Sequence, residues 1–281
     1  MPPSLPTYTA TRYAVPLREG GSLPAVIETA EAGLFVTKFR GAGQGALPLV
    51  AELIVGLLAS HLGLPVPDLA LIDVDASLGR SERDPDIYGL LRASHGLNVG
   101  LRYLDSAFAY DPLVTPPFAT PELAADIVWL DAYVTNVDRT ANNTNLLIWQ
   151  RALWLIDHGA ALYFHFNWPG VDEARIASPF AHIRDHVLLT VAGDLAAADA
   201  RLTAQLGDGV FAEILAVVPD DLLLPETERS SLPFASADEA RAAYVDYLTR
   251  RLRPPRAFVG EAVRAQEQQR ARPSETLSYR R

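Results

Sequence analysis

NVDRTANNTNLLIWQRALWLIDHG, residues 136–159, opens with the densest polar stretch of the chain. Its first ten residues are rich in Asn and Asp, which favour turns, so they predict a loop. Two short apolar runs follow, Asn145–Trp149 and Leu153–Ile156, and their spacing predicts a hairpin. Asp157-His158-Gly159 comes directly after the second run. The stretch therefore predicts a polar loop and a hairpin that ends at a carboxylate.

The spacing of the polar residues resembles the catalytic and metal-binding loops of protein kinases. Asp138 and Asn143 stand five residues apart, as the aspartate and asparagine do in H-R-D-x-x-x-x-N. Asp157 follows 19 residues after Asp138, and Gly159 stands two residues beyond it, as in D-F-G. Each of these residues alone is common in turns, so the prediction depends on the joint spacing.

Phosphoryl transfer requires these residue types, because the protein mainly positions groups and neutralises charge. A carboxylate can accept the proton of an acceptor hydroxyl, which makes Asp138 the candidate base. An amide oxygen and a second carboxylate are hard oxygen ligands suited to Mg²⁺, so Asn143 and Asp157 are the candidate metal ligands. Arg139 is a candidate to brace the loop or to offset its charge.

GLFVTKFRG, residues 33–41, contains the only lysine among the 24 basic residues of the chain. Lys38 lies in an alternating strand with one polar face, so it projects into a cleft or lies on the opposite side. Glu52 is the only formally charged residue between Arg40 and Asp68. A buried carboxylate is costly unless it is paired, and Lys38 is the nearest candidate partner.

Kinases pair a strand lysine, which holds the α- and β-phosphates of ATP, with a helix glutamate that orients it. A lysine is a compact point charge on a thin stem, whereas an arginine is a wide planar fork. This difference explains why a single lysine would be retained among arginines. The alternative is that Lys38 is a surface residue without a special role.

A rival hypothesis comes from GAGQGA, residues 41–46, which fits the pattern G-x-G-x-x-A of dinucleotide-binding βαβ units. It follows a predicted strand and precedes a predicted helix. The strand carries the polar residues Thr37, Lys38 and Arg40, whereas a central parallel strand is apolar nearly throughout. The hypothesis also leaves residues 136–159 unexplained.

Taken together, these residues resemble a HipA-like kinase domain, a family related to the phosphoinositide-kinase-like fold. The resemblance covers most of residues 18–160. Besides Lys38 and Glu52, it rests on the segments REGGSLP (18–24), LRASHGLNVGLRYL (91–104), NVDRTANN (136–143) and LWLIDHG (153–159). It implies an α+β, two-lobed protein-kinase-like fold, in which ATP lies between a β-rich N-lobe with one long helix and a mostly helical C-lobe.

The resemblance implies that Lys38 binds the phosphates of ATP beside Glu52, that Asp138 is the catalytic base, and that Asn143 and Asp157 hold Mg²⁺. The implied activity is an ATP- and Mg²⁺-dependent transfer of the γ-phosphoryl group to a hydroxyl. By resemblance alone, the acceptor is a Ser or Thr of a protein.

Further nucleotide contacts follow from the same resemblance. The turn Gly20-Gly21-Ser22 would cover the phosphates with backbone N–H groups. Leu90 and Leu91 would lie near the hinge that holds the adenine.

The chain departs from the family pattern at three places. Thr140 stands where better-known members have a histidine, His158 stands at the phenylalanine of D-F-G, and the Gly-rich segment is short. A nucleotide-binding pseudokinase is therefore an alternative function. This alternative is disfavoured because a decayed site usually loses at least one of the residues that bind phosphate, metal or the acceptor proton. The chain retains all four of them: Lys38, Asp138, Asn143 and Asp157.

The periodicity of the chain predicts its remaining elements. Strands are expected at Ala25–Thr29, Leu34–Arg40, Leu69–Asp75 and Ile87–Arg92, and helices at 47–62, 121–134, Val187–Leu206, Val210–Val218 and Ala237–Leu252. We expect an N-lobe over residues 1–90, a linker over 91–104, a C-lobe over 105–255 and a disordered tail over 256–281.

Composition excludes several classes of protein. The 281 residues are 49% hydrophobic and contain no cysteine, so the chain is globular and has no disulfide or thiolate metal site. The net charge of −10 argues against direct nucleic-acid binding, which depends on phosphate neutralisation. No signal peptide or membrane-spanning pattern is visible, so we expect a cytoplasmic protein without a membrane partner.

Overall fold

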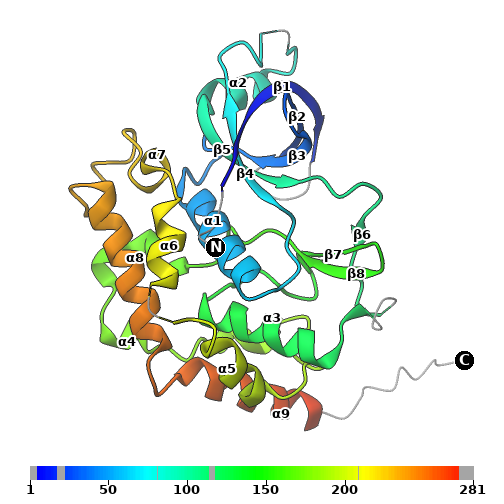
Figure 1. Cartoon of the computed structure of the whole chain (residues 1–281), viewed down its shortest axis with the longest axis vertical. Helices are drawn as coiled ribbons and strands as arrows, with labels where there is room; N and C mark the ends of the chain where they lie inside the picture. Colours follow the sequence, from blue (N-terminus) through cyan, green and yellow to red (C-terminus); the bar gives the residue numbers. More distant parts are fainter. Residues whose placement is uncertain (1–4, 18–22, 81, 114–117, 208, 272–281) are drawn as a thin grey trace, which may run out of the picture.

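A five-stranded barrel forms the N-terminal part of the structure (Figure 1). The computed structural model describes residues 5–17, 23–80, 82–113, 118–207 and 209–271. Around the barrel the strands run in the order β1 (Thr7–Pro16), β2 (Ala25–Thr29), β3 (Gly33–Lys38), β5 (Gly96–Arg102) and β4 (Leu69–Val74). Neighbouring strands are antiparallel except β1 and β4, whose parallel pairing closes the barrel.

The side chains of the barrel strands alternate between two separate cores, because successive residues of a strand point to opposite faces. Phe35, Ala70 and Ile72 belong to the core inside the barrel. Leu71 and Val99 face outward and belong to the large core that the helices share. Lys38 pairs with Val99 across β3 and β5, so it lies on this outer face, which answers the question left open by the sequence.

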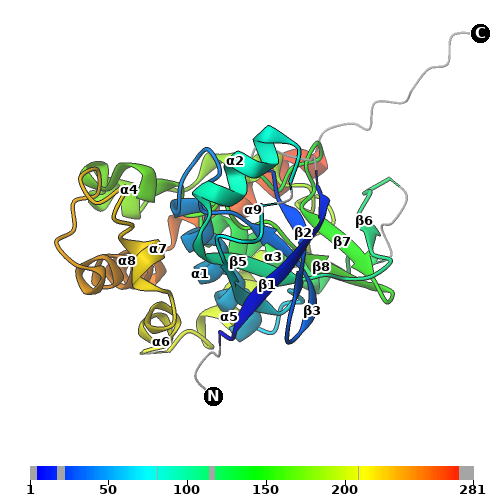
Figure 2. The ribbon, with the colours of Figure 1, turned by 90° about the horizontal axis from the view of Figure 1, so that it is seen from above.

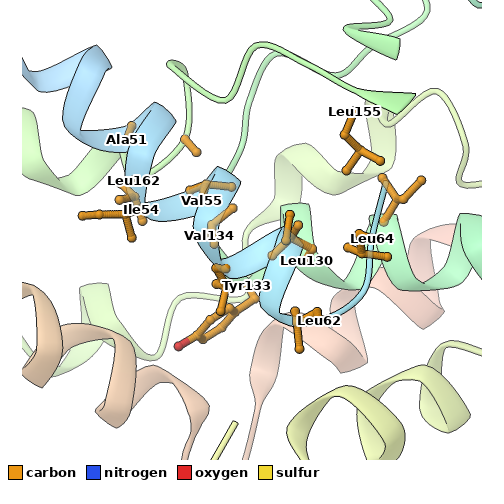
Figure 3. Packing of buried hydrophobic residues seen from close by; sticks show 14 of the residues in the cluster. Ala51, Ile54, Val55, Leu62, Leu64, Leu130, Tyr133, Val134, Leu155 and Leu162 are labelled. Carbon is orange, nitrogen blue, oxygen red and sulfur yellow. The ribbon is translucent and has the colours of Figure 1, made fainter. Parts of the chain in front are cut away.

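Helix α1 (Leu47–His61) connects the barrel to the rest of the molecule. Eleven consecutive residues of α1, Leu49–Ala59, are buried, as expected for a helix that is apolar on all sides. Figure 3 shows Val55 of α1 close to Val134 and Leu130 at the end of α3 (Pro121–Tyr133), and Ile54 of α1 close to Leu162. Because its whole circumference is packed, α1 fixes the position of the barrel relative to the helical part.

Most of the remaining elements are helices at the other end of the long axis (Figure 1). Seen from above, the hairpin of residues 146–155 and the helices of residues 210–252 lie on opposite sides of α1 (Figure 2). The sheet strands are β6 (Phe108–Ala109), β7 (Leu146–Trp149) and β8 (Ala152–Leu155), and the helices are α4 (Glu173–Ile176), α5 (Leu195–Thr203), α6 (Val210–Ala216), α7 (Asp220–Leu223), α8 (Ala237–Leu252) and α9 (Ala257–Ala271). The 3₁₀ segments Tyr163–Gly170 and Ala181–Asp185 lie between β8 and α5.

Several predicted elements are confirmed to within two residues: β2, β3, β4, β7, β8, α1, α3, α6 and α8. Residues 87–92, predicted as a strand, instead lie in helix α2 (Pro85–Ala93). The side chain of Asp84 accepts hydrogen bonds from the N–H groups of Asp86 and Ile87, and Pro85 occupies the first turn. This N-cap begins a helix, and its signal outweighs the apolar run.

Three other expectations were wrong. The predicted linker, residues 91–104, contains the end of α2 and the barrel strand β5. The predicted helix over 187–206 is reduced to α5, because Gly193 and the N-cap Asp194 place its start at residue 195. The predicted disordered tail forms α9, whose Phe258 and Ala262 are buried, up to residue 271; the rest of that tail lies outside the described residues.

No helix within the described ranges combines the length and the apolar character needed to cross a membrane.

Candidate active site

The structure brings Lys38, Glu52 and Asp157 together in a cluster that we call the lysine triad. The Nζ atom of Lys38 lies 2.5 Å from Oε2 of Glu52 and 2.5 Å from Oδ1 of Asp157. The side chains of Lys38 and Glu52 are 9% and 0% exposed, whereas that of Asp157 is 41% exposed. The triad therefore has a buried end at Glu52 and an open end at Asp157.

Three different elements supply the triad. Lys38 ends β3, Glu52 lies in the second turn of α1, and Asp157 follows β8. The backbone of Asp157 has φ +55°, a left-handed conformation that Asp tolerates better than most residues. Gly159 then passes close to Lys38, since a Cβ atom at Gly159 would lie 3.5 Å from Nζ.

Electrostatics favour the charged forms of the triad. Burial alone lowers the pKa of Lys38, but the carboxylates of Glu52 and Asp157 outweigh burial and raise it above its usual value. Burial raises the pKa of Asp157, but Lys38 outweighs it and holds that pKa below its usual value. An ammonium flanked by two carboxylates remains protonated and can attract a phosphate group.

The predicted catalytic loop lies between α3 and β7. Oδ2 of Asp138 accepts hydrogen bonds from Nδ2 of Asn143 at 2.7 Å and from Nδ2 of Asn145 at 3.3 Å. The N–H of Asp138 donates to Oδ1 of Asn136 at 3.1 Å, which fixes the start of the loop. Asp138 and Asn143, which the sequence placed five residues apart, are therefore in direct contact.

Behind the loop lies a buried group of side chains centred on Asp131, which we call the Asp131 network. Oδ2 of Asp131 accepts hydrogen bonds from Nε of Arg139 at 2.6 Å and from Nε2 of His186 at 2.9 Å. Oδ1 accepts from Nδ2 of Asn136 at 2.9 Å. The Arg139 side chain also donates to the backbone oxygen of Asn145. Arg139 thus connects the end of α3 to the end of the loop.

Burial raises the pKa of Asp131, but Arg139 and His186 outweigh burial and hold that pKa far below its usual value. Sequence reasoning missed Asp131 and His186. Asp131 could have been found by the signal that identified Glu52, because it is a carboxylate in the apolar run IVWLDAYV. His186 lies 55 residues from Asp131, and no motif spacing connects them.

His158 joins the two groups. Its backbone N–H donates to Oε2 of Glu52 at 2.8 Å, and its Nδ1 accepts from Nη2 of Arg139 at 3.3 Å. Burial lowers the pKa of His158 to about 4, so the ring is neutral at pH 7. A polar ring at this position couples the lysine triad to the Asp131 network, which a phenylalanine could not do.

The predicted nucleotide contacts outside the triad have different outcomes. Gly20, Gly21 and Ser22 lie outside the described residues. Leu90 and Leu91 were predicted to lie near a hinge that holds the adenine, but they do not lie between the barrel and the helical part. They belong to α2, where Leu91 is buried in the core inside the barrel and Leu90 packs against that core.

The dinucleotide hypothesis for GAGQGA was wrong. β3 pairs with β2 and β5, both antiparallel, and not with β4, so β3, α1 and β4 do not form a βαβ unit. The glycines have local roles instead. A Cβ atom at Gly41 would lie within 2.7 Å of Ala93 and Ser94, and Gly45 has φ +69°. The start of α1 is already bound by a carboxylate, because the N–H of Ala46 donates to Oε1 of Glu228 at 3.1 Å.

Comparison with known proteins identifies the family. The model of the HipA-like kinase family matches residues 15–230 of this 281-residue chain. Among solved structures, the chain is similar to a crystal structure of the Helicobacter pylori proinflammatory kinase CtkA, with a TM-score of 0.53 and 12% identity over 95% of this chain and 99% of that chain. At this identity, the likeness supports a mixed α+β, kinase-like fold alone. No curated protein matches the sequence. Because the family model matches more than half of its residues, the chain belongs to the HipA-like kinase family, a family of phosphotransferases.

Proposed function

We propose that the protein transfers the γ-phosphoryl group of ATP, with Mg²⁺, to the hydroxyl of a Ser or Thr residue in another protein. The observation that carries this proposal is the lysine triad. Lys38 is held 2.5 Å from two carboxylates that lie 14 and 119 residues away along the chain. Family membership supports phosphoryl transfer, and the triad supports ATP as the donor, because a fixed ammonium can hold its α- and β-phosphates.

The nucleotide would lie between two lobes, the barrel with α1 and the helical part. Val26, Val36 and Leu101 stand opposite one another on β2, β3 and β5, and Val36 shares the outer face of β3 with Lys38. This apolar row supports an adenine site next to the ammonium that would hold the phosphates. The connection between the lobes would then follow β5, at residues 103–107, rather than at Leu90 and Leu91.

Asp138 would act as the base. Its Oδ2 atom is held by the amides of Asn143 and Asn145, and no hydrogen bond to Oδ1 is present within the described ranges. This arrangement supports a carboxylate that is fixed in position and has one oxygen available for the acceptor hydroxyl. Arg139 would position the loop from behind and would not touch the substrate.

The residues present fit a Mg²⁺ ion. Nδ2 of Asn143 donates to Asp138, so this contact does not use its amide oxygen, and Asp157 is 41% exposed beside Lys38. Both are hard oxygen donors, which Mg²⁺ prefers. When bound, Mg²⁺ supplies positive charge to the phosphates. Asn143 and Asp157 would hold it, and Lys38 would keep Asp157 ionised.

The first test is ATP turnover by the full chain, measured as ADP release with a Ser- and Thr-containing protein mixture. Asp138→Asn preserves the two amide contacts and removes the base, so turnover should fall about 10²–10⁴-fold while calorimetric binding of Mg-ATP is retained. Asp238→Asn, an exposed carboxylate at the start of α8, is the matched control and should keep full turnover.

Two results would contradict the proposal. Mg-ATP binding without turnover in the wild type would identify a pseudokinase. Mg-ATP binding that is unchanged in Lys38→Met would exclude the lysine triad as the phosphate site, even if turnover were present.

A further inference from the structure

The end of helix α9 holds a segment that is distant from it in the sequence. Helix α9 lies at the end of the molecule opposite the barrel (Figure 1). Nε2 of Gln266 donates to the backbone oxygen of Ala192 at 2.8 Å and to that of Leu189 at 3.1 Å. Both acceptors belong to residues 184–193, which lead from the second 3₁₀ segment to α5.

Two further side chains of α9 bind the same segment. Nε2 of Gln269 donates to the backbone oxygen of Arg184. Nη2 of Arg270 donates to the backbone oxygen of Ala192 at 2.5 Å. Gln266 is 6% exposed, whereas Arg270 is exposed. We call these three donors, Gln266, Gln269 and Arg270, the α9 brace.

The braced segment needs partners from outside for its backbone. From Val187 onwards it forms turns rather than a helix or a strand, so its carbonyl groups are not satisfied by a regular hydrogen-bond pattern. Leu188 and Leu189 are 0% exposed. A buried carbonyl that water cannot reach is costly unless a protein group binds it. The α9 brace supplies these donors and thereby fixes the path of the segment.

The same segment binds the catalytic loop directly. The N–H of Val187 donates to the backbone oxygen of Arg139 at 3.1 Å, and Arg139 stands next to Asp138 in the sequence. His186 pairs with Thr140 in an isolated antiparallel β-bridge. The two residues that follow Asp138 are therefore held by the segment that the α9 brace holds.

The segment also orients His186 in the Asp131 network. Nδ1 of His186 accepts a hydrogen bond from the N–H of Leu188 at 3.0 Å, so the proton of the neutral ring is on Nε2. Nε2 then donates to Oδ2 of Asp131 at 2.9 Å, and the same oxygen accepts from Arg139. A shift of the segment would alter the contacts of Asp131 and, through them, the position of the loop.

We propose that Gln266 is a positioning residue for phosphoryl transfer, which acts through residues 184–193 to hold Asp138 in place for the acceptor hydroxyl. Gln266 lies outside residues 15–230, the part of the chain that the family model matches. The inference rests on the proposed function, because that function assigns the role of base to Asp138. Within the described ranges, no hydrogen bond joins the α9 brace to the lysine triad.

The first experiment measures turnover and nucleotide binding in Gln266→Met, which keeps the length of the side chain and removes its N–H donors. ADP release by the full chain is followed with the Ser- and Thr-containing protein mixture. We expect kcat to fall about 10–100-fold, because a small displacement of a catalytic group is enough for such a loss. KM for ATP should change by less than about 2-fold, since the lysine triad is not contacted.

Calorimetry separates positioning from loss of folded protein. The stoichiometry of Mg-ATP binding counts the folded molecules, so it should be the same in Gln266→Met and in the wild type. Arg264→Gln is the matched control, because Arg264 is exposed on the same helix and pairs with Glu261. It should keep the wild-type kcat.

The exposed end of the brace provides a variant that does not depend on a buried substitution. Arg270→Met should lower kcat by about 3-fold, and Arg270→Lys, which keeps a donor for Ala192, should restore it. If Gln266→Met does not fold, this pair decides the inference. Equal kcat values in Arg270→Met and the wild type would then contradict it.

The second experiment is independent of activity. Hydrogen–deuterium exchange of the full chain is followed by mass spectrometry in the wild type and in Gln266→Met. Peptides that cover residues 136–145 and 184–193 should exchange about 10-fold faster in the variant, because the brace no longer limits local opening. The peptide that covers β3 should exchange at the wild-type rate.

The outcomes distinguish this inference from the proposed function. Faster exchange at residues 184–193 alone would overturn the inference, because the brace would then hold the segment without holding the loop. A fall in kcat that is matched by a fall in Mg-ATP stoichiometry would show a merely structural role. Absence of turnover in the wild type would contradict the proposed function, whereas hydrogen exchange would still decide whether the brace holds the loop.

Discussion

The lysine triad and the Asp131 network each centre on a buried carboxylate, but they satisfy it differently. Both oxygens of Asp131 are bound, by Arg139, His186 and Asn136. Oε1 of Glu52, in contrast, is buried without a hydrogen-bond partner in the described part of the chain. The Asp131 network therefore uses all of its carboxylate oxygens to hold the loop in place. The lysine triad retains a carboxylate oxygen that is available to a ligand.

Exposure shows the same contrast. Every charged side chain of the Asp131 network is almost fully buried, whereas the lysine triad opens to solvent at Asp157. A closed network can contribute to stability and positioning but cannot meet a substrate. An open one can exchange an internal partner for a phosphate or a metal ion. Four changes test this division, in order of decreasing effect.

Asp131→Asn should have the largest effect, because it leaves Arg139 buried without its counter-ion. We expect the free energy of unfolding to fall by about 3–5 kcal/mol, and phosphoryl transfer to be lost with it. Urea unfolding measures the first effect. Asp126→Asn is the control on the same helix; Asp126 pairs with the partly exposed Arg201, and its loss should cost about 1 kcal/mol or less. Equal losses would show that the network has no special role.

Asp157→Asn should separate activity from stability. It removes the open carboxylate of the lysine triad and keeps the shape of the side chain, so turnover should fall roughly 10²-fold or more. Because Asp157 is 41% exposed, the free energy of unfolding should change by only about 1 kcal/mol or less. Turnover and urea unfolding on the same preparation provide the check. A large loss of stability would place Asp157 with the closed network.

His165→Gln tests a buried side chain for which we propose no role in ligand binding. Burial lowers its pKa to about 3, and its Nδ1 lies 3.0 Å from the hydroxyl of Tyr244. The unfolded chain therefore binds the extra proton below about pH 6.5, and stability is lost as the pH falls towards 3. Between pH 7.5 and pH 5 this histidine should account for a loss of about 2 kcal/mol.

The measurement is urea unfolding at pH 7.5 and pH 5. In His165→Gln the loss between these two pH values should be smaller than in the wild type by about 2 kcal/mol. An exposed histidine supplies the control, since His182→Gln should leave the loss unchanged. If both variants keep the wild-type pH dependence, His165 is not held neutral by burial.

Glu228→Gln should have the smallest effect. The Glu228 carboxylate accepts the N–H of Ala46 at the start of α1, where a negative charge interacts favourably with the helix dipole. Its loss should lower the free energy of unfolding by about 0.5–1 kcal/mol. Mg-ATP affinity should fall by less than about 5-fold, because only the orientation of Glu52 is affected. Glu226→Gln, in the same loop and 87% exposed at its side chain, is the matched control for calorimetry.

The sequence predicted local elements and charge pairs better than long-range pairing. The Lys38–Glu52 contact followed from the isolation of two charges in apolar surroundings, and the structure confirms that contact. The roles of Lys38, Asp138, Asn143 and Asp157 stay predictions, which the experiments above test. The pairing of Asp131 with His186 was not accessible, because it depends on how the segment after Gly159 returns to α3.

Barrel closure was missed for a similar reason. The stretch TYTATRYAV in β1 alternates like the other strands, but its parallel pairing with β4 spans more than 60 residues. Strand pairing at such separation depends on the tertiary fold rather than on local pattern. Helix α2 was missed for the opposite reason, since its Asp84-Pro85 cap is a local signal that the apolar run obscured.

The single lysine has a practical consequence for chemical labelling. Lys38 is the only side-chain amine in the chain, and it is held protonated and 9% exposed between two carboxylates. Amine-reactive reagents attack the neutral, accessible form, so in the folded protein they should modify the α-amino group and leave Lys38 intact. Acylation of residue 38 therefore becomes a direct readout of opening between the barrel and the segment after β8. No engineered reporter is needed, because the sequence contains no other lysine.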